Sequence, residues 1–389
     1  MVQASKRAST CPASGIRAMG ALAAGYKNVL NLGIGEPDFN IGANVAEAMK
    51  KAIDDGKNKY TPTAGIAPLR AAIARKLKRE NNIDCAPESV MMSNGACGAI
   101  MTTILGVTDP GDEVLLPDPA WSNYQGQVHT AGCKAVFYPL LEEHKFHVRA
   151  EVLERYITPK TRLLLLNSPS NPTGGVTTRE ELQEIADLMK KHDIAVISDE
   201  PYEQLLYDGA EHVSIGSLPG MQDYVFTANT FSKTYAMTGL RIGYVQGPVE
   251  IVKSLCKLQE GMGSCVNEPS QWAAIEALEG SQDYVEEMRK TYAARRKILV
   301  DGLNSLPGVT CLAPEGAFYV FPNISKHGKS HDVAIDWLKR AQILSIPGTA
   351  FGAAGEGYIR MCFAVSESTI RETISRLSGI LTEGSIPAR

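Results

Sequence analysis

The stretch LLLLNSPSNPTG, residues 163–174, joins four consecutive leucines to a turn rich in proline, asparagine and serine. A short run that is apolar at every position is typical of a strand buried on both faces of a parallel sheet. Ligands of open α/β sheets bind outside the carboxyl ends of the strands. Two X-Pro bonds in the turn favour a cis peptide that directs Asn171 into such a crevice. The stretch therefore predicts an α/β fold and a ligand site at one sheet edge, although a plain Pro/Gly turn would look similar.

Short apolar runs alternate with helical patterns on both sides of this stretch. Strands separated by helices predict a mostly parallel sheet with helices on both faces. We expect strands at residues 114–117, 135–138, 163–167, 195–199, 224–229 and 243–246, and helices at 95–105, 120–131, 178–191 and 249–258.

The pattern changes after residue 281. A long amphipathic, densely charged helix is expected at 282–305, followed by strands at 309–312, 317–321 and 358–364 and a helix from Asp332. One further strand is expected near the start of the chain, at 29–32. We therefore predict a large domain at residues 46–281 and a smaller α+β domain formed by residues 1–45 together with 282–389.

Composition excludes several classes of protein. The 389 residues include 39 Lys and Arg against 43 Asp and Glu, a net charge of −4 that argues against nucleic-acid binding. No apolar run approaches the roughly 20 residues needed to span a membrane. The eight cysteines form no C-x-x-C pair and no zinc-like spacing, so we expect no metal and a reducing compartment, the cytoplasm. The first acidic residue is Glu36, but prolines and glycines interrupt the preceding arm, so we favour part of the mature fold over a transit peptide.

A lysine and a group of hydroxyls follow one predicted strand, in TFSKTY at 230–235 and GLRIG at 239–243. A lysine among hydroxyls and apolar groups, near an arginine, can have a lowered pKa and act as a nucleophilic amine, whereas a lone lysine is usually a solvated charge. The hydroxyls and Arg241 can bind a phosphate. The stretch SNGACGA at 93–99 opens an apolar helix whose free N–H groups suit an anion, although alone it is only a turn.

Two buried charges need partners. Asp199 ends the strand predicted at 195–199, and Arg360 lies inside an apolar strand pattern. A buried charge is costly unless it is paired, so each indicates a ligand, a helix cap or an internal ion pair. Taken together, the motifs give a phosphate cradle, a nucleophilic lysine, a carboxylate, an asparagine and an isolated arginine. This combination is typical of a pyridoxal phosphate site.

On these motifs, and on NLGIGEPDF at 31–39, the sequence resembles the class I/II aminotransferases, fold type I enzymes of the aspartate-aminotransferase type. The resemblance extends from Asn31 to Arg360. It implies a three-layer fold, a homodimer with shared active sites, and transfer of an amino group between an L-amino acid and a 2-oxo acid through a Schiff base on Lys233. A C–S β-lyase or another elimination enzyme on the same fold is the alternative.

The resemblance also implies roles for individual residues. Lys233 would hold pyridoxal phosphate and shuttle the substrate α-proton, and Asp199 would pair with the pyridine nitrogen. Around the cofactor it implies Asn171 and Tyr202 at the phenolic oxygen, Trp121 stacked on the ring, and Thr230, Ser232, Arg241, Gly95, Ala96, Cys97 and the Tyr60 of a partner subunit at the phosphate. For the substrate it implies Arg360 at the α-carboxylate, with Asn171, Gly35 and Trp121.

Two departures from the dicarboxylate-specific relatives bear on the substrate. Those relatives carry hydroxyls where this chain has Gly95 and Cys97, so phosphate binding here would depend more on backbone N–H groups. They also carry an arginine for the distal carboxylate, and alignment on the Asn-x-Pro element at 267–269 places Met262 there. With uncharged Ile16 and Cys97 as other lining candidates, we predict a preference for neutral donors unless a cation such as Arg17 reaches the pocket.

Overall fold

The computed structural model describes residues 2–382, and a seven-stranded sheet forms its centre. The five strands from β7 to β4 run parallel, and β8 is antiparallel to both of its neighbours. This confirms the α/β class with a mostly parallel sheet. The strand order is β2 (Val90–Ser93), β8 (Gly243–Gln246), β7 (Val225–Thr230), β6 (Ala195–Asp199), β5 (Thr161–Asn167), β3 (Glu113–Asp118) and β4 (Lys134–Pro139).

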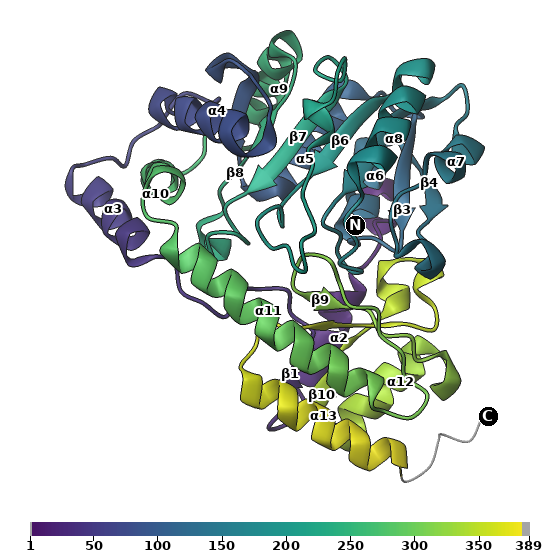
Figure 1. Cartoon of the computed structure of the whole chain (residues 1–389). Coiled ribbons are helices and arrows are strands. Elements are labelled where there is room, and N and C mark those ends of the chain that lie inside the picture. Colours follow the sequence, from purple (N-terminus) through teal and green to yellow (C-terminus); the bar gives the residue numbers. More distant parts are fainter. Residues whose placement is uncertain (1, 383–389) are drawn as a thin grey trace.

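Helices cover both faces of this sheet (Figure 1). One apolar core packs α5, α6 and α9 against one face, and a second core, which includes the buried face of α8, lies against the other. The carboxyl ends of β5, β6 and β7 lie at the same edge of the sheet, because the three strands are parallel. The helices in this part are α3 (Ala43–Asp54), α4 (Ala67–Asn81), α5 (Gly95–Val107), α6 (Asn123–Ala131), α7 (Ala150–Leu153), α8 (Arg179–His192), α9 (Val249–Gly263) and α10 (Glu268–Glu279).

Two small sheets lie below the large one in Figure 1, beside the long helix α11 (Asp283–Asn304). The first pairs β1 (Leu30–Asn31) in parallel with β10 (Ile343–Leu344), which joins the two ends of the chain. The second has the order β11 (Ile346–Pro347), β12 (Ile359–Cys362), β9 (Tyr319–Val320). The remaining helices are α1 (Lys6–Ser9), α2 (Gly15–Ala23), α12 (Ser330–Asp336) and α13 (Glu367–Thr382).

Local sequence explains several helix ends. At α8, the Thr178 hydroxyl accepts from the Glu181 N–H while the Glu181 carboxylate accepts from the Thr178 N–H, a capping box that satisfies two free donors. The Asn-x-Pro element begins α10, because the Asn267 side chain accepts from the Ser270 N–H and Pro269 needs no partner in a first turn. The element is therefore a helix start.

Two expected elements differ from the structure. The strand predicted at 309–312 is wrong beyond a single bridge at Thr310, because the Asn304 side chain bonds both the N–H and the C=O of Cys311 and replaces ladder bonds. The helix predicted from residue 120 begins at Asn123. Ala120 instead donates its N–H to the Phe351 carbonyl, which ties the turn before α6 to the region of the small sheets.

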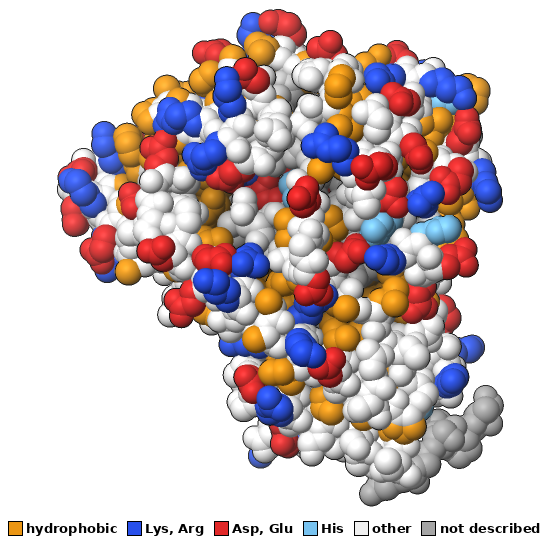
Figure 2. All heavy atoms as spheres, in the orientation of Figure 1, with side chains coloured by type: hydrophobic (Ala, Val, Ile, Leu, Met, Phe, Trp, Pro, Cys, Tyr) orange, Lys and Arg blue, Asp and Glu red, His pale blue; other side chains and the backbone are white. Residues whose placement is uncertain are grey.

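Acidic and basic side chains are interspersed over the face shown in Figure 2, without a large area of one sign. This agrees with the near-zero charge balance of the sequence. Within residues 2–382, no helix is both long enough and apolar enough to cross a membrane.

Candidate active site

A cavity of about 310 Å³ opens at the carboxyl edge of the large sheet, where the part of the chain that carries the two small sheets packs against that edge. This volume lies at the lower end of the range for small-molecule sites. Every site residue predicted from the sequence lines it except Gly95 and Tyr60. The lining residues are Ile16, Ile34, Gly35, Ala96, Cys97, Trp121, Tyr124, Asn167, Asn171, Asp199, Pro201, Tyr202, Thr230, Ser232, Lys233, Arg241, Tyr319 and Arg360.

Lys233 extends into this cavity from the loop after β7. Its Nζ donates to the Gly35 carbonyl at 2.6 Å and lies 5.6 Å from the centre of the Phe318 ring. Burial lowers the pKa of Lys233 to about 8, because the charged form loses hydration. A larger fraction of this amine than of an ordinary lysine is therefore uncharged and nucleophilic near neutral pH.

Asp199 stands at the end of β6 and is almost completely buried. Its Oδ2 accepts from the Tyr124 hydroxyl at 2.5 Å, while Oδ1 has no hydrogen-bond partner in the described part of the chain. Burial raises the pKa of Asp199 to about 7, even though the Tyr124 bond lowers it. A carboxyl group of this kind is suited to a cationic N–H donor, which would stabilise its ionised form.

The loop after β7, the turn before α5 and the start of β8 form the anion-binding end of the cavity. The Thr230 and Ser232 hydroxyls lie 2.8 Å apart, and Arg241 follows close by. A Cβ on Gly95 would lie 2.8 Å from an Arg241 guanidinium nitrogen, and one on Gly243 would lie 2.6 Å from the Gly95 carbonyl carbon. The small residues therefore allow the close approach that leaves the N-terminus of α5 open to an anion.

Arg360 on β12 is the buried arginine expected from the sequence, with 1% of its surface exposed. It donates to the Asn171 side-chain carbonyl at 3.0 Å and to the Gly33 carbonyl at 2.5 Å. Its guanidinium lies between the rings of Tyr319 and Phe351, and no carboxylate among the described residues forms an ion pair with it. The internal ion pair considered from sequence is thus not formed, and the charge suits an anionic ligand.

The turn that carries Asn171 has the geometry predicted from its prolines. The Ser168–Pro169 and Asn171–Pro172 peptides are both cis. The Asn171 N–H donates to the Asn167 side chain, whose amide in turn donates to the Asp199 carbonyl. The ends of β5 and β6 are thereby tied together at the cavity floor.

The outer side of the cavity is apolar. Ile16 from α2, Ile34 and Cys97 line it, and Ile34 is 53% exposed. Burial raises the pKa of the Cys97 thiol, so this side chain is neutral. Trp121 lies edge-on to Tyr124 at 5.3 Å between ring centres.

Three residues considered from the sequence lie away from the cavity of this chain. Tyr60 is 91% exposed, Met262 in the last turn of α9 is 50% exposed, and Arg17 is exposed on α2. Gly95 lies beside Arg241, which lines the cavity.

Sequence reasoning missed two tyrosines that the fold brings into the site. Tyr124 bonds Asp199, and the Tyr319 hydroxyl lies 2.9 Å from the Tyr202 hydroxyl. A usable signal for Tyr124 is its place three residues after Trp121, whose carbonyl accepts from the Tyr124 N–H at the start of α6. Tyr319 gave none, because 117 residues separate it from its partner.

The family model for aminotransferase class I and II matches residues 27–377. The chain is 42% identical to an aspartate aminotransferase of Pyrococcus abyssi, over 95% of this chain and 96% of that protein. It is 40% identical to aromatic-amino-acid aminotransferase 2 of Thermococcus litoralis, over 95% and 96%. Among solved structures, it is similar to an alanine aminotransferase of Pyrococcus furiosus, with a TM-score of 0.93 and 34% identity over 98% of this chain and all of that one.

Proposed function

The chain belongs to the class I and II aminotransferases and is a pyridoxal-phosphate-dependent transaminase; within that activity, we propose the residue roles, substrate preference and assembly that follow. Relatives and solved structures alike favour transamination over β-elimination.

The cavity fits pyridoxal phosphate on its own features. The Asp199 Oδ1, buried without a partner among the described residues, suits the N–H of a protonated pyridine ring. The cradle around Gly95, Gly243 and Thr230 suits a phosphate. When bound, the cofactor supplies an aldehyde that condenses with amines and a ring that withdraws electrons from the substrate α-carbon.

We propose that Lys233 anchors the cofactor and then moves the α-proton. The observation that carries this is its buried Nζ, with a pKa lowered to about 8, among Asp199, Arg360 and the hydroxyl cradle in one cavity. A free amine of this pKa can remove a proton from the substrate α-carbon as a general base and then donate it to a different atom as a general acid. Arg360 and Asn171 hold the substrate α-carboxylate, which orients the α-hydrogen, while Tyr202 and Tyr319 offer hydroxyls at the cofactor oxygen.

We propose that the preferred donors have neutral side chains. The outer side presents Ile16, Ile34 and Cys97, and among the described residues the cations of the cavity are Lys233, Arg241 and Arg360, which the roles above already use. A distal carboxylate there would lose hydration without gaining a partner from this chain. The names of the relatives refer to aspartate, aromatic amino acids and alanine, so members of this family differ in the side chain of the amino acid that they accept.

We propose a homodimer in which Tyr60 acts on the partner subunit's phosphate site. The 91% exposure of Tyr60 supports this, because its aromatic ring and hydroxyl are available to a second chain and tyrosine is enriched at interfaces. The turn that carries Tyr60 is fixed by bonds from the Lys59 N–H to Glu268 and from the Thr61 N–H to Cys265, which place it beside the exposed end of α9. We further propose the domains 46–281 and 1–45 with 282–389, supported by the pairing of β1 with β10.

A hybrid dimer tests the assembly. Lys233→Ala and Tyr60→Ala homodimers should each bind the cofactor weakly, whereas a mixed dimer should contain one site with both native side chains and regain tight binding at that site. A mixed dimer without a tight site, or an active monomer, would refute the proposal.

We also propose the cytoplasm as the compartment. The eight cysteines all lie among the described residues, and they are free thiols there. Thiols persist in a reducing environment.

The half-reaction tests the function. Holoenzyme mixed with alanine and no oxo acid should yield one equivalent of pyruvate per site, with the cofactor left in its amine form and no ammonia. The same holoenzyme mixed with an S-alkyl cysteine, which carries a β-leaving group, should release no thiol; repeated release of thiol, pyruvate and ammonia with the cofactor unchanged would show elimination instead.

A further inference from the structure

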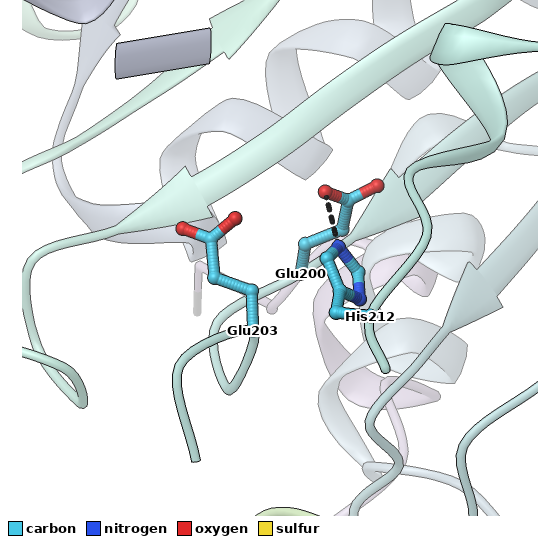
Figure 3. A group of neighbouring side chains, drawn as sticks. All are labelled: Glu200, Glu203 and His212. Atoms are coloured by element: carbon cyan, nitrogen blue, oxygen red, sulfur yellow. Dashed lines mark hydrogen bonds and ion pairs between the residues drawn. The ribbon is translucent and has the colours of Figure 1, made fainter. Parts of the chain in front are cut away.

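Four charged side chains lie buried behind the wall of the cavity, and we call them the buried ion network: Lys76, Glu200, Glu203 and His212. Their side chains are 2%, 1%, 6% and 7% exposed, respectively. Figure 3 shows the two carboxyl groups and His212 gathered in one place, with the imidazole on Glu200. None of the four lines the cavity.

The network resembles a metal site in its two carboxylates and imidazole, yet its four carboxylate oxygens and the His212 Nε2 already have protein partners, and only the His212 Nδ1 has none among the described residues. Glu203 accepts from Lys76 and from Asn229 at Oε1, and from Asn81 at Oε2. Glu200 accepts from Ser198 at Oε1, and from His212 and Ser214 at Oε2. A metal ion would have to displace a buried ammonium, so the cation of this site is Lys76.

Each acidic member of the network faces a basic one. Burial lowers the pKa of His212, but Glu200 and Glu203 together outweigh burial and raise it. Burial likewise raises the pKa of Glu203, but Lys76, His212 and Asn81 together outweigh burial and lower it. Two carboxyl groups thus face an ammonium and an imidazole, and removing one member would leave a buried polar group without its partner.

The network reaches the anion-binding end of the cavity through one side chain, Asn229. Its amide donates to Glu203 Oε1 at 2.7 Å, and its side-chain carbonyl accepts from the Thr230 N–H at 2.7 Å. Thr230 is the residue whose hydroxyl pairs with Ser232 in the cradle. A chain of bonds therefore runs from Lys76 on α4, through Glu203 and Asn229, to the Thr230 backbone.

We propose that Glu203, anchored by Lys76, is a positioning residue that acts through Asn229 to fix Thr230 and Ser232 where their hydroxyls meet the cofactor phosphate. A buried chain of hydrogen bonds holds neighbouring groups in one arrangement when each of its links is made, as is every link from Lys76 to the Thr230 backbone. The inference rests on the proposed assignment of Thr230 and Ser232 to the phosphate. Neither Glu203 nor Asn229 lines the cavity, so each would act through Thr230 and Ser232.

The test compares two ligands that differ only in the phosphate. Apoenzyme dissociation constants are measured for both ligands, and the ratio of the constant for pyridoxal to the constant for pyridoxal phosphate reports the contribution of the phosphate. Asn229→Ala, which removes both bonds of the link, should lower the ratio at least tenfold and leave pyridoxal binding within twofold. Glu203→Gln should lower it by less, because a neutral acceptor still faces Asn229.

Glu113→Gln is the matched control. Glu113 is a carboxylate of the same exposure, 6%, paired with Lys134 and Thr158 at the amino end of β3, far from the cradle along the strand. It should leave the ratio within twofold. A ratio unchanged in both Asn229→Ala and Glu203→Gln, or lowered equally by Glu113→Gln, would overturn the inference.

Thr230→Ala and Ser232→Ala separate this failure from failure of the proposed function. If they lower the ratio while Asn229→Ala and Glu203→Gln do not, the phosphate assignment stands and the positioning role falls. If they too leave the ratio unchanged, the phosphate assignment itself is wrong.

Discussion

The two sides of the active-site cavity are built in different ways. On the inner side, at the sheet edge, each polar group is held by another protein group, as Asp199 is by Tyr124 and Arg360 is by Asn171. On the outer side, Ile16 and Ile34 are apolar and partly exposed. The difference teaches that reaction chemistry is fixed by buried contacts that reach deep into the fold, whereas substrate choice depends on a few surface side chains that can change at little cost to stability.

Removing the inner carboxylate should have the largest effect of these variants. Asp199→Ala deletes the partner of the ring nitrogen, and loss of a buried charge-assisted bond costs about 3–5 kcal/mol, or roughly two to four powers of ten in kcat/KM. Asp199→Glu should retain part of the activity because it keeps the charge. Turnover in the alanine variant within tenfold of wild type would rule out this role.

Removing the group that holds this carboxylate should have a smaller effect. Tyr124→Phe deletes a hydrogen bond to a charged group, so we expect cofactor affinity to fall about ten- to hundredfold. The bond lowers the pKa of Asp199, so its loss should raise that pKa. Cofactor binding, which weakens when Asp199 is protonated, should therefore begin to weaken at a higher pH in the variant. Tyr138→Phe, which deletes a buried tyrosine bond to the Leu165 carbonyl, is the control and should show no such pH shift.

A charge on the outer side should change substrate choice without harming the chemistry. We expect wild-type kcat/KM for aspartate to exceed that for alanine by less than a hundredfold. Ile16→Arg should raise this ratio about tenfold through a new carboxylate partner, with alanine kcat nearly unchanged. An aspartate preference of a hundredfold or more in the wild type would show that a cation reads the distal carboxylate.

The smallest effect concerns a buried histidine beyond the Asn171 turn. His147 bridges Glu181 and Glu315, and Glu315 also donates its N–H to the Gly174 carbonyl in that turn. Burial would lower the pKa of His147, but the two carboxylates raise it to about 9. A raised pKa contributes stability that is complete below about pH 6.5 and is lost as pH rises through 9.

His147→Gln should therefore lower the melting temperature by a few degrees at pH 6 and by progressively less above pH 9. His129→Gln, at a partly buried histidine whose ring bonds Thr10 and the Arg7 carbonyl and no carboxylate, serves as the control and should lower the melting temperature equally at pH 6 and pH 10. An equal loss in the His147→Gln variant at these two pH values would contradict the bridging role.

Much of the inner side could be predicted from the sequence, because the groups follow strands directly. Asp199, Thr230 and Asn171 come within a few residues of a strand end, and parallel pairing brings such ends to one edge. The alternation of strands and helices likewise predicted the large sheet.

The rest could not be predicted because it depends on contacts between distant segments. Glu203 meets Lys76 across 127 residues, and no local pattern marks either as buried. The strand expected at 309–312 failed for a related reason, since its backbone partner is the Asn304 side chain instead of another strand. Tyr60 was assigned through the resemblance alone, since its side chain is exposed and does not line the cavity of its own chain.

The most direct test of the central claim is reduction of the holoenzyme with borohydride, followed by peptide mapping of the modified lysine. The account predicts one pyridoxyl group per chain, on Lys233, and none in a Lys233→Ala variant that has also lost nearly all turnover. A pyridoxyl group on another lysine of the wild type, or stoichiometric labelling that persists in Lys233→Ala, would contradict it.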